Sequence, residues 1–115
     1  MYKLNGVRIT QKGTQMRAEA EFQEIVSEVK VFGRYNLTNS IGLDRYRKLG
    51  KALGKQGKLT HDCIARVHDG DLSMFTNKDK EFQIETEYDD FYKEDVVKSV
   101  YLNASFNEAL TSIRL

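Results

Sequence analysis

The chain has 115 residues, of which 40% are hydrophobic and 30% are charged, and its formal net charge at pH 7 is +1. This size and balance predict one globular domain covering residues 1–115 and exclude a disordered chain. No apolar run is longer than three residues, which excludes a membrane-spanning helix. The single cysteine, Cys63, cannot form an internal disulfide, so we expect a reducing, cytoplasmic location.

The first residues alternate as a β-strand does. Tyr2 and Leu4 share one parity, Val7 and Ile9 share the other, and Asn5-Gly6 lies where the parity changes. A strand with a bulge at Asn5-Gly6 is therefore expected, followed by a turn over residues 11–14.

Residues 15–32 fit two interpretations. As a helix, capped by Thr14 and ended by Gly33, the segment has one apolar stripe made by Ala18, Phe22, Ile25, Val26, Val29 and Phe32. As two strands, it alternates at Met16, Ala18, Ala20 and Phe22, and later at Val29, Val31, Tyr35 and Leu37. The strands need a turn near Gln23-Glu24, where no typical turn residue stands, so we favour the helix and keep the strands as the alternative.

The next segment predicts a helix over about 41–55, capped by Ser40. Its apolar face consists of Ile41, Tyr46, Leu49, Ala52 and Leu53, and basic side chains occupy the opposite face. Three glycines, Gly50, Gly54 and Gly57, weaken its C-terminal half.

A three-stranded antiparallel meander is expected over about 61–88. Its strands are residues 63–67, 72–75 and 82–88, with turns at Asp69-Gly70 and at 77–79. A C-terminal helix follows, with Leu102, Phe106, Ala109, Leu110 and Ile113 on one face, and residues 95–101 are either its extension or an edge strand. The predicted fold class is α+β, with an antiparallel sheet formed by the meander and the N-terminal strand.

Candidate chemical sites are incomplete in this sequence. His61, Cys63 and His68 are metal-ligand types, but the chain has only two histidines, and a structural role is the simpler interpretation. The acidic turn at Asp69 lacks the glycine and the glutamate of a calcium loop, and residues 50–55 are one residue short of a phosphate loop. We therefore expect no metal, no cofactor and no enzymatic activity.

Charge is segregated along the chain. Six basic residues and no acid lie between positions 45 and 58, namely Arg45, Arg47, Lys48, Lys51, Lys55 and Lys58. Along one helix face they could contact phosphates, so nucleic-acid binding is one functional hypothesis.

The opposite charge gathers in residues 79–95, which contain eight acids and two lysines. Aromatic side chains alternate with acids in its second half, at Glu87, Tyr88, Asp89, Asp90, Phe91, Tyr92, Glu94 and Asp95. Aromatics anchor interfaces and carboxylates steer a basic partner, so the leading hypothesis is a binding protein, an inhibitor or adaptor, that recognises a basic protein surface here. Self-association through the two charged regions is a third hypothesis.

Overall fold

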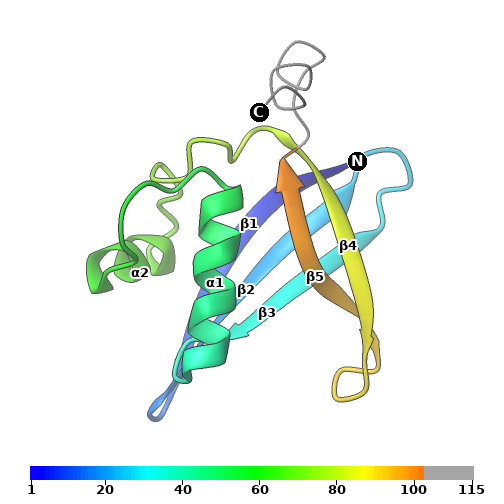
Figure 1. Cartoon of the computed structure of the whole chain (residues 1–115). Helices are drawn as coiled ribbons and strands as arrows, with labels where there is room; N and C mark the ends of the chain where they lie inside the picture. Colours follow the sequence, from blue (N-terminus) through cyan, green and yellow to red (C-terminus); the bar gives the residue numbers. More distant parts are fainter. Residues whose placement is uncertain (103–115) are drawn as a thin grey trace.

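The computed structural model describes residues 1–102, which form five strands and two helices (Figure 1). In chain order these are β1 (Tyr2–Lys12), β2 (Gln15–Glu24), β3 (Lys30–Asn36), α1 (Ser40–Ala52), α2 (His61–His68), β4 (Glu81–Asp89) and β5 (Glu94–Leu102). The fold is thus α+β, as the sequence predicts. No helix in this part of the chain is long and apolar enough to cross a membrane.

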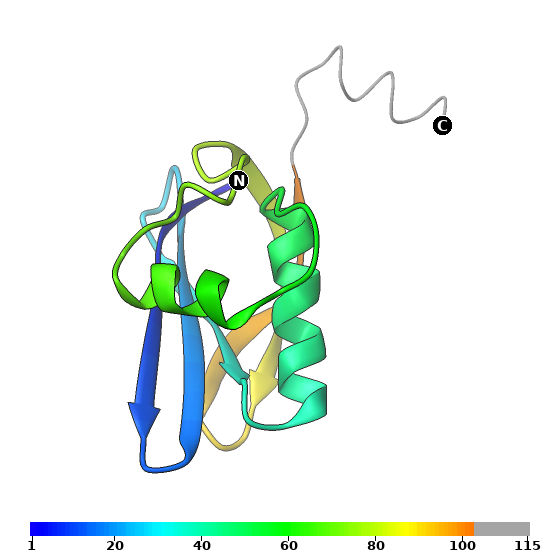
Figure 2. The same ribbon diagram turned by 90° about the vertical axis from the view of Figure 1, so that its left-hand side faces the viewer.

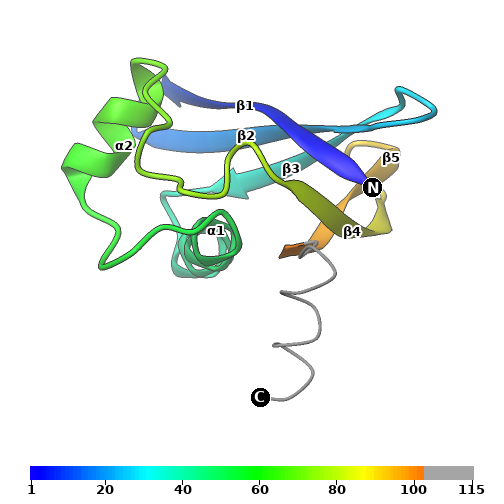
Figure 3. The same cartoon turned by 90° about the horizontal axis from the view of Figure 1, so that it is seen from above.

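The strands close into a barrel in the order β1-β2-β3-β5-β4 (Figure 3). Neighbouring strands are antiparallel except β3 and β5, which are parallel and meet at Phe32 and Val96. Closure between β1 and β4 involves only Tyr2 opposite Phe82 and Lys3 opposite Glu81. The expected purely antiparallel sheet is therefore wrong, because β5 joins the distant β3 as well as β4.

The predicted bulge in β1 is confirmed. Leu4 pairs with Phe22, but the next pair joins Gly6 to Glu21, so one residue of β1 is extra at Asn5. Beyond the bulge, Val7 and Ile9 point into the core. The bulge thus lets one strand pair with both β2 and β4 while its inward face stays apolar.

Residues 15–36 form two strands, so the favoured helix over 15–32 is wrong and the alternative is right. The turn between β2 and β3 is built without glycine or proline. The Glu24 carboxylate accepts hydrogen bonds from the amides of Val26 and Ser27, both at 3.0 Å, and Glu28 has a left-handed φ of 63°. The Glu24 side chain thus accepts the turn amides, a role that Asn or Asp side chains usually have in turns.

The basic helix is confirmed as α1, although it ends three residues earlier than expected. Its N-cap is Asn39 rather than Ser40, and the Asn39 side chain accepts a hydrogen bond from the Gly42 amide at 2.7 Å. At its C-terminus, the amides of Gly54 and Lys55 bond to the carbonyls of Lys51 and Gly50 at 3.0 and 2.8 Å. With Gly54 at φ +87°, this is a Schellman motif.

The expected strands at 63–67 and 72–75 are wrong. Residues 61–68 form α2, whose N-cap Thr60 accepts a hydrogen bond from the Cys63 amide. A hydrogen bond of 3.0 Å between His68 Nδ1 and the Ile9 carbonyl ties α2 to the part of β1 that does not pair with β4. Figure 2 shows α2 beside β1. Phe75 is buried in an irregular segment that leads to β4.

The strand predicted at 82–88 is confirmed as β4, and the undecided segment 95–101 belongs to β5. The predicted helix after Leu102 lies outside the described residues. The core joins both parts of the barrel: Phe22 and Phe82 are fully buried and meet edge to face at 5.9 Å. Leu53, also fully buried, brings the end of α1 into the same core.

Candidate functional site

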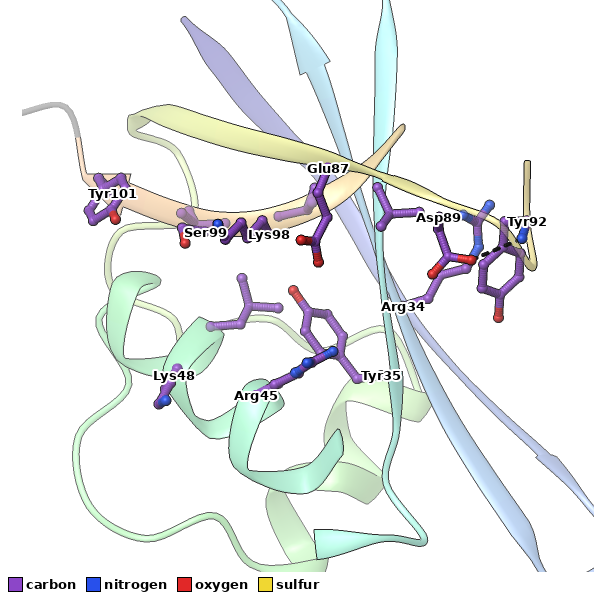
Figure 4. Close-up of a pocket in the computed structure, with 14 residues that line it drawn as sticks. Arg34, Tyr35, Arg45, Lys48, Glu87, Asp89, Tyr92, Lys98, Ser99 and Tyr101 are labelled. Carbon is purple, nitrogen blue, oxygen red and sulfur yellow. Dashed lines mark hydrogen bonds between the residues drawn. The ribbon is translucent and has the colours of Figure 1, made fainter. Parts of the chain in front are cut away.

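A groove runs between α1, the outer face of β1–β3 and the β4–β5 hairpin (Figure 4). It consists of two adjoining cavities of about 440 and 550 Å³, which share Arg34, Tyr35, Arg45, Asp89 and Tyr92 in their linings. The first cavity lies between α1 and β5, and the second crosses the outward-facing residues of β1–β3. We call the two together the hairpin groove.

Strand register places polar side chains in two rows across the outer face. One row is Arg8, Glu19 and Arg34, and the other is Thr10, Arg17 and Asn36. All six line the second cavity. These positions are outward because their neighbours Val7, Ile9, Ala18 and Tyr35 are buried in the core.

Arg34, on β3, lines both cavities of the groove and joins β5 of the hairpin to β2 and β3. Its guanidinium donates hydrogen bonds to Glu19 on β2, at 3.2 Å, and to Glu94 on β5. The same group lies 4.2 Å from the centre of the Tyr92 ring and 5.1 Å from that of Phe32. A planar cation that is both paired and stacked in this way fixes the geometry of its neighbours, so we assign Arg34 a positioning role.

The hairpin tip is ordered by Asp89. Its carboxylate accepts hydrogen bonds from the amides of Phe91 and Tyr92, at 2.8 and 3.0 Å. Figure 4 shows the second of these. Lys93 follows with a left-handed φ of 54°. The turn presents Phe91, which is 80% exposed and packs edge to face on Tyr92 with ring centres 4.9 Å apart.

Cations outnumber acids in the lining of the groove. The six basic residues are Arg8, Arg17, Arg34, Arg45, Lys48 and Lys98, and the three acids are Glu19, Glu87 and Asp89. Glu87 points from β4 toward Arg45 and Tyr35 (Figure 4). Burial, followed by the nearby Tyr46, raises the pKa of Tyr35, so Tyr35 is a neutral phenol at physiological pH.

The acidic and aromatic residues predicted at 87–95 to bind a partner lie on different surfaces of the structure. Glu87, Asp89 and Tyr92 line the groove, Phe91 lies at its rim, and Glu94 pairs with Arg34. Tyr88, Asp90 and Asp95 are exposed outside it. The Asp89 carboxylate accepts hydrogen bonds from two amides of the turn, which gives it a structural role there.

The basic helix is divided as well. Arg45 and Lys48 line the hairpin groove, and Lys48 also pairs with Asp44 at 3.5 Å. The other four basic residues, Arg47, Lys51, Lys55 and Lys58, line a separate cavity of about 430 Å³. The structure thus brings part of the basic segment and part of the acidic segment together in one groove.

Sequence reasoning missed Arg8, Arg17 and Arg34. Each stands at an outward position between residues whose side chains point inward. This pattern is visible in β1, but at Arg17 the helix interpretation of residues 15–32 hid it, and Arg34 lies just after that segment. Their convergence depends on strand register, which joins residues that are far apart in the chain.

The other candidate residues lie away from the groove. Cys63 is on α2, where a hydrogen bond from the Thr60 hydroxyl, at 3.2 Å, lowers the pKa of its thiol. Within residues 1–102, no group of three or more His, Cys, Asp or Glu side chains is placed to hold a metal ion.

Comparisons of this chain with protein-family models, curated proteins and solved structures found no match. The geometry and charge of the hairpin groove are therefore the basis on which a function can be assigned.

Proposed function

We propose that this chain is a non-catalytic binding protein that holds single-stranded nucleic acid in the hairpin groove. The observation that supports this most is the exposed Phe91, which stands beside a groove lined by four arginines, Arg8, Arg17, Arg34 and Arg45. Aromatic faces stack on unpaired bases and cations neutralise phosphates, the two requirements for binding a single strand.

The strand order supports the same function by analogy. A closed β1-β2-β3-β5-β4 barrel with a helix between β3 and β4 resembles the topology of the OB fold. In that fold, the face of strands 2 and 3 and the loops joining strands 1–2 and 4–5 bind oligonucleotides and oligosaccharides. The hairpin groove occupies the corresponding face, beside the β4–β5 loop. Because a fold hosts many functions, this likeness is secondary to the chemistry of the groove.

The arrangement of the groove favours a strand over a compact ligand. The two cavities adjoin, so a bound chain can pass from the outer face of β1–β3 to the space between α1 and β5. Arginines are spread along this path, with Arg8 and Arg17 at one end and Arg45 near the middle. A repeating series of phosphates matches spaced cations, and guanidinium groups bind phosphates with two hydrogen bonds.

The proposal is tested by fluorescence anisotropy with a labelled, unstructured oligonucleotide of about twelve nucleotides, within the usual span of one such barrel. A duplex of the same length is the comparison. We expect the single strand to bind more tightly, because its bases are free to stack on Phe91. No binding of the single strand, or equal binding of the duplex, would contradict the proposal.

A protein partner remains the second candidate, supported by the exposed outer side of the hairpin. Tyr88 is 61% exposed there, and Asp90 and Asp95 are exposed as well. In this case the partner has a basic surface, and the pair Asp90→Lys and Asp95→Lys slows association without changing the oligonucleotide affinity. Capture from nuclease-treated extract, with Asp69→Lys, an exposed acid after α2, as a matched control, distinguishes this candidate from the first.

A further inference from the structure

We propose that a second, separate site binds a phosphate group in the cavity beside the C-terminal end of α1. This cavity, here called the basic pocket, has a volume of about 430 Å³ and is lined by α1 and by the loop that follows it. Its charged lining residues are Arg47, Lys51, Lys55 and Lys58, and no acid lines it. It shares no lining residue with the hairpin groove.

The charge of the basic pocket is not compensated. Among residues 1–102, none of its four cations forms an ion pair with a carboxylate, whereas Lys48 on the same helix pairs with Asp44. Four cations around one cavity repel one another, and an anion that neutralises them stabilises the fold. The pocket therefore favours an anionic ligand over a neutral or cationic one.

Local structure holds the cations around the cavity. The Lys55 ammonium donates hydrogen bonds to the carbonyls of Gln56 and Lys58, at 2.7 and 3.1 Å, and so fixes the loop. Gly57, at φ +80°, turns the chain in a conformation that other residues rarely adopt. Arg47, Lys51 and Lys58 are exposed and remain available to the ligand.

The helix dipole opposes this assignment, since α1 presents its negative end here. Three hydrogen bonds reduce that effect: the carbonyls of Gly50, Lys51 and Leu53 accept from the amides of Lys55, Gly54 and Asn77. The dipole is equivalent to about half a charge, which four full positive charges outweigh.

The chemistry of the pocket favours phosphate over smaller anions. Three available cationic side chains can donate to several oxygens at once, which a tetrahedral phosphate offers and chloride does not. One wall is apolar, formed by Leu59 and the buried Tyr46 and Phe75. Attraction between charges is stronger beside such a wall than in open water.

The test is a titration of the isotope-labelled full chain with inorganic phosphate, followed by amide NMR shifts at constant ionic strength. Saturable shifts are expected at Lys51, Gly57 and Lys58, and not in a matched chloride titration. The pair Lys51→Ala and Lys58→Ala should weaken phosphate binding at least about tenfold, since two charged hydrogen bonds are lost. The control pair Lys3→Ala and Lys12→Ala, on β1, should leave the affinity unchanged.

Linear shifts equal to those of chloride, or an unchanged affinity of the Lys51/Lys58 pair, would overturn the assignment. Thermal melting of each variant shows whether it is folded.

The same NMR spectra identify the source of the phosphate. If it belongs to nucleic acid, an oligonucleotide displaces inorganic phosphate from the basic pocket; if it belongs to a free phosphorylated molecule, the phosphate shifts persist. Either result is consistent with a phosphate site in the basic pocket, and neither requires nucleic acid to bind in the hairpin groove.

Discussion

Phe91 exposes most of its ring to solvent, and hydrogen bonds and ring contacts hold the turn that carries it. Its exposed ring is supported by Tyr92, which in turn is stacked on Arg34. The turn beneath it is closed by the Asp89 carboxylate. An aromatic ring held in this way loses little conformational freedom when a base stacks on it, which favours binding.

Replacing the Phe91 ring should lower the affinity for the oligonucleotide and leave the stability of the fold nearly unchanged. Phe91→Ala should weaken binding of the single-stranded oligonucleotide about tenfold, since stacking contributes roughly 1–3 kcal/mol per base. Its free energy of unfolding should change by less than about 0.5 kcal/mol, because the side chain is exposed. Anisotropy and thermal melting measure the two effects. Tyr88→Ala is the matched control, an exposed aromatic on the same hairpin that does not line the groove; equal losses in both variants would exclude a specific role for Phe91.

Two aliphatic residues, Ile41 in α1 and Leu53 directly after it, test the orientation of this helix. Leu53 is fully buried, whereas Ile41 is 67% exposed although the periodicity of the sequence places both on the apolar face. Leu53→Ala should lower the free energy of unfolding by about 2–5 kcal/mol, and Ile41→Ala by less than about 0.5 kcal/mol. Chemical denaturation of both variants measures the difference. Similar values for the two would show that α1 packs through another face.

At the scale of elements, the β2–β3 turn depends on one carboxylate. A hydrogen bond from the N-terminal ammonium group, followed by those from the Ser27 and Val26 amides, lowers the pKa of Glu24 from 4.5 to about 2. The ionised form is therefore favoured in the folded chain. Its contribution to stability is complete above pH 4.5 and is lost as the pH falls toward 2.

Glu24→Gln should therefore lower the melting temperature at pH 7, and the difference from wild type should shrink as the pH falls from about 4.5 toward 2. Thermal melts across this pH range measure it. Glu85→Gln, an exposed residue of β4, is the control and should show no such trend. A Glu24→Gln deficit that stays constant down to pH 2 would mean that the carboxylate does not hold the turn through its charge.

Elements with a strong local pattern could be predicted from the sequence. Alternation identified β1 with its bulge, and β4; helical spacing identified α1. The strands β2 and β3 were kept only as the alternative to a helix, because their turn has no typical turn residue and is closed by the Glu24 side chain. The short helix α2 was taken for a strand because eight residues fit either period.

The candidate site could be predicted only in part, because its residues come from distant parts of the chain. The sequence identified Arg45, Lys48 and Tyr92 as functional candidates, but in two separate surfaces. Their meeting follows from the parallel contact of β3 with β5, which no local pattern encodes. The positions of Arg8 and Arg17 likewise depend on register between strands.

At the scale of the whole molecule, the two charged segments of the sequence partly neutralise each other across the hairpin groove. Glu87, from the acidic segment, points toward Arg45, from the basic segment (Figure 4), whereas no acid lines the basic pocket. The net charge of +1 therefore hides two positive regions on the surface. Such local fields, rather than the net charge, determine the partners that a protein attracts.

The most direct measurement of the central claim is the salt dependence of oligonucleotide binding for wild type and for the pair Arg17→Ala and Arg45→Ala. Each phosphate contact contributes about 0.7 to the slope of log K against log salt for a single strand. The pair should therefore bind more weakly and flatten the slope by about 1.4, whereas Arg66→Ala on α2 should leave both unchanged. A wild-type affinity and slope in the Arg17/Arg45 pair would contradict binding of nucleic acid in the hairpin groove.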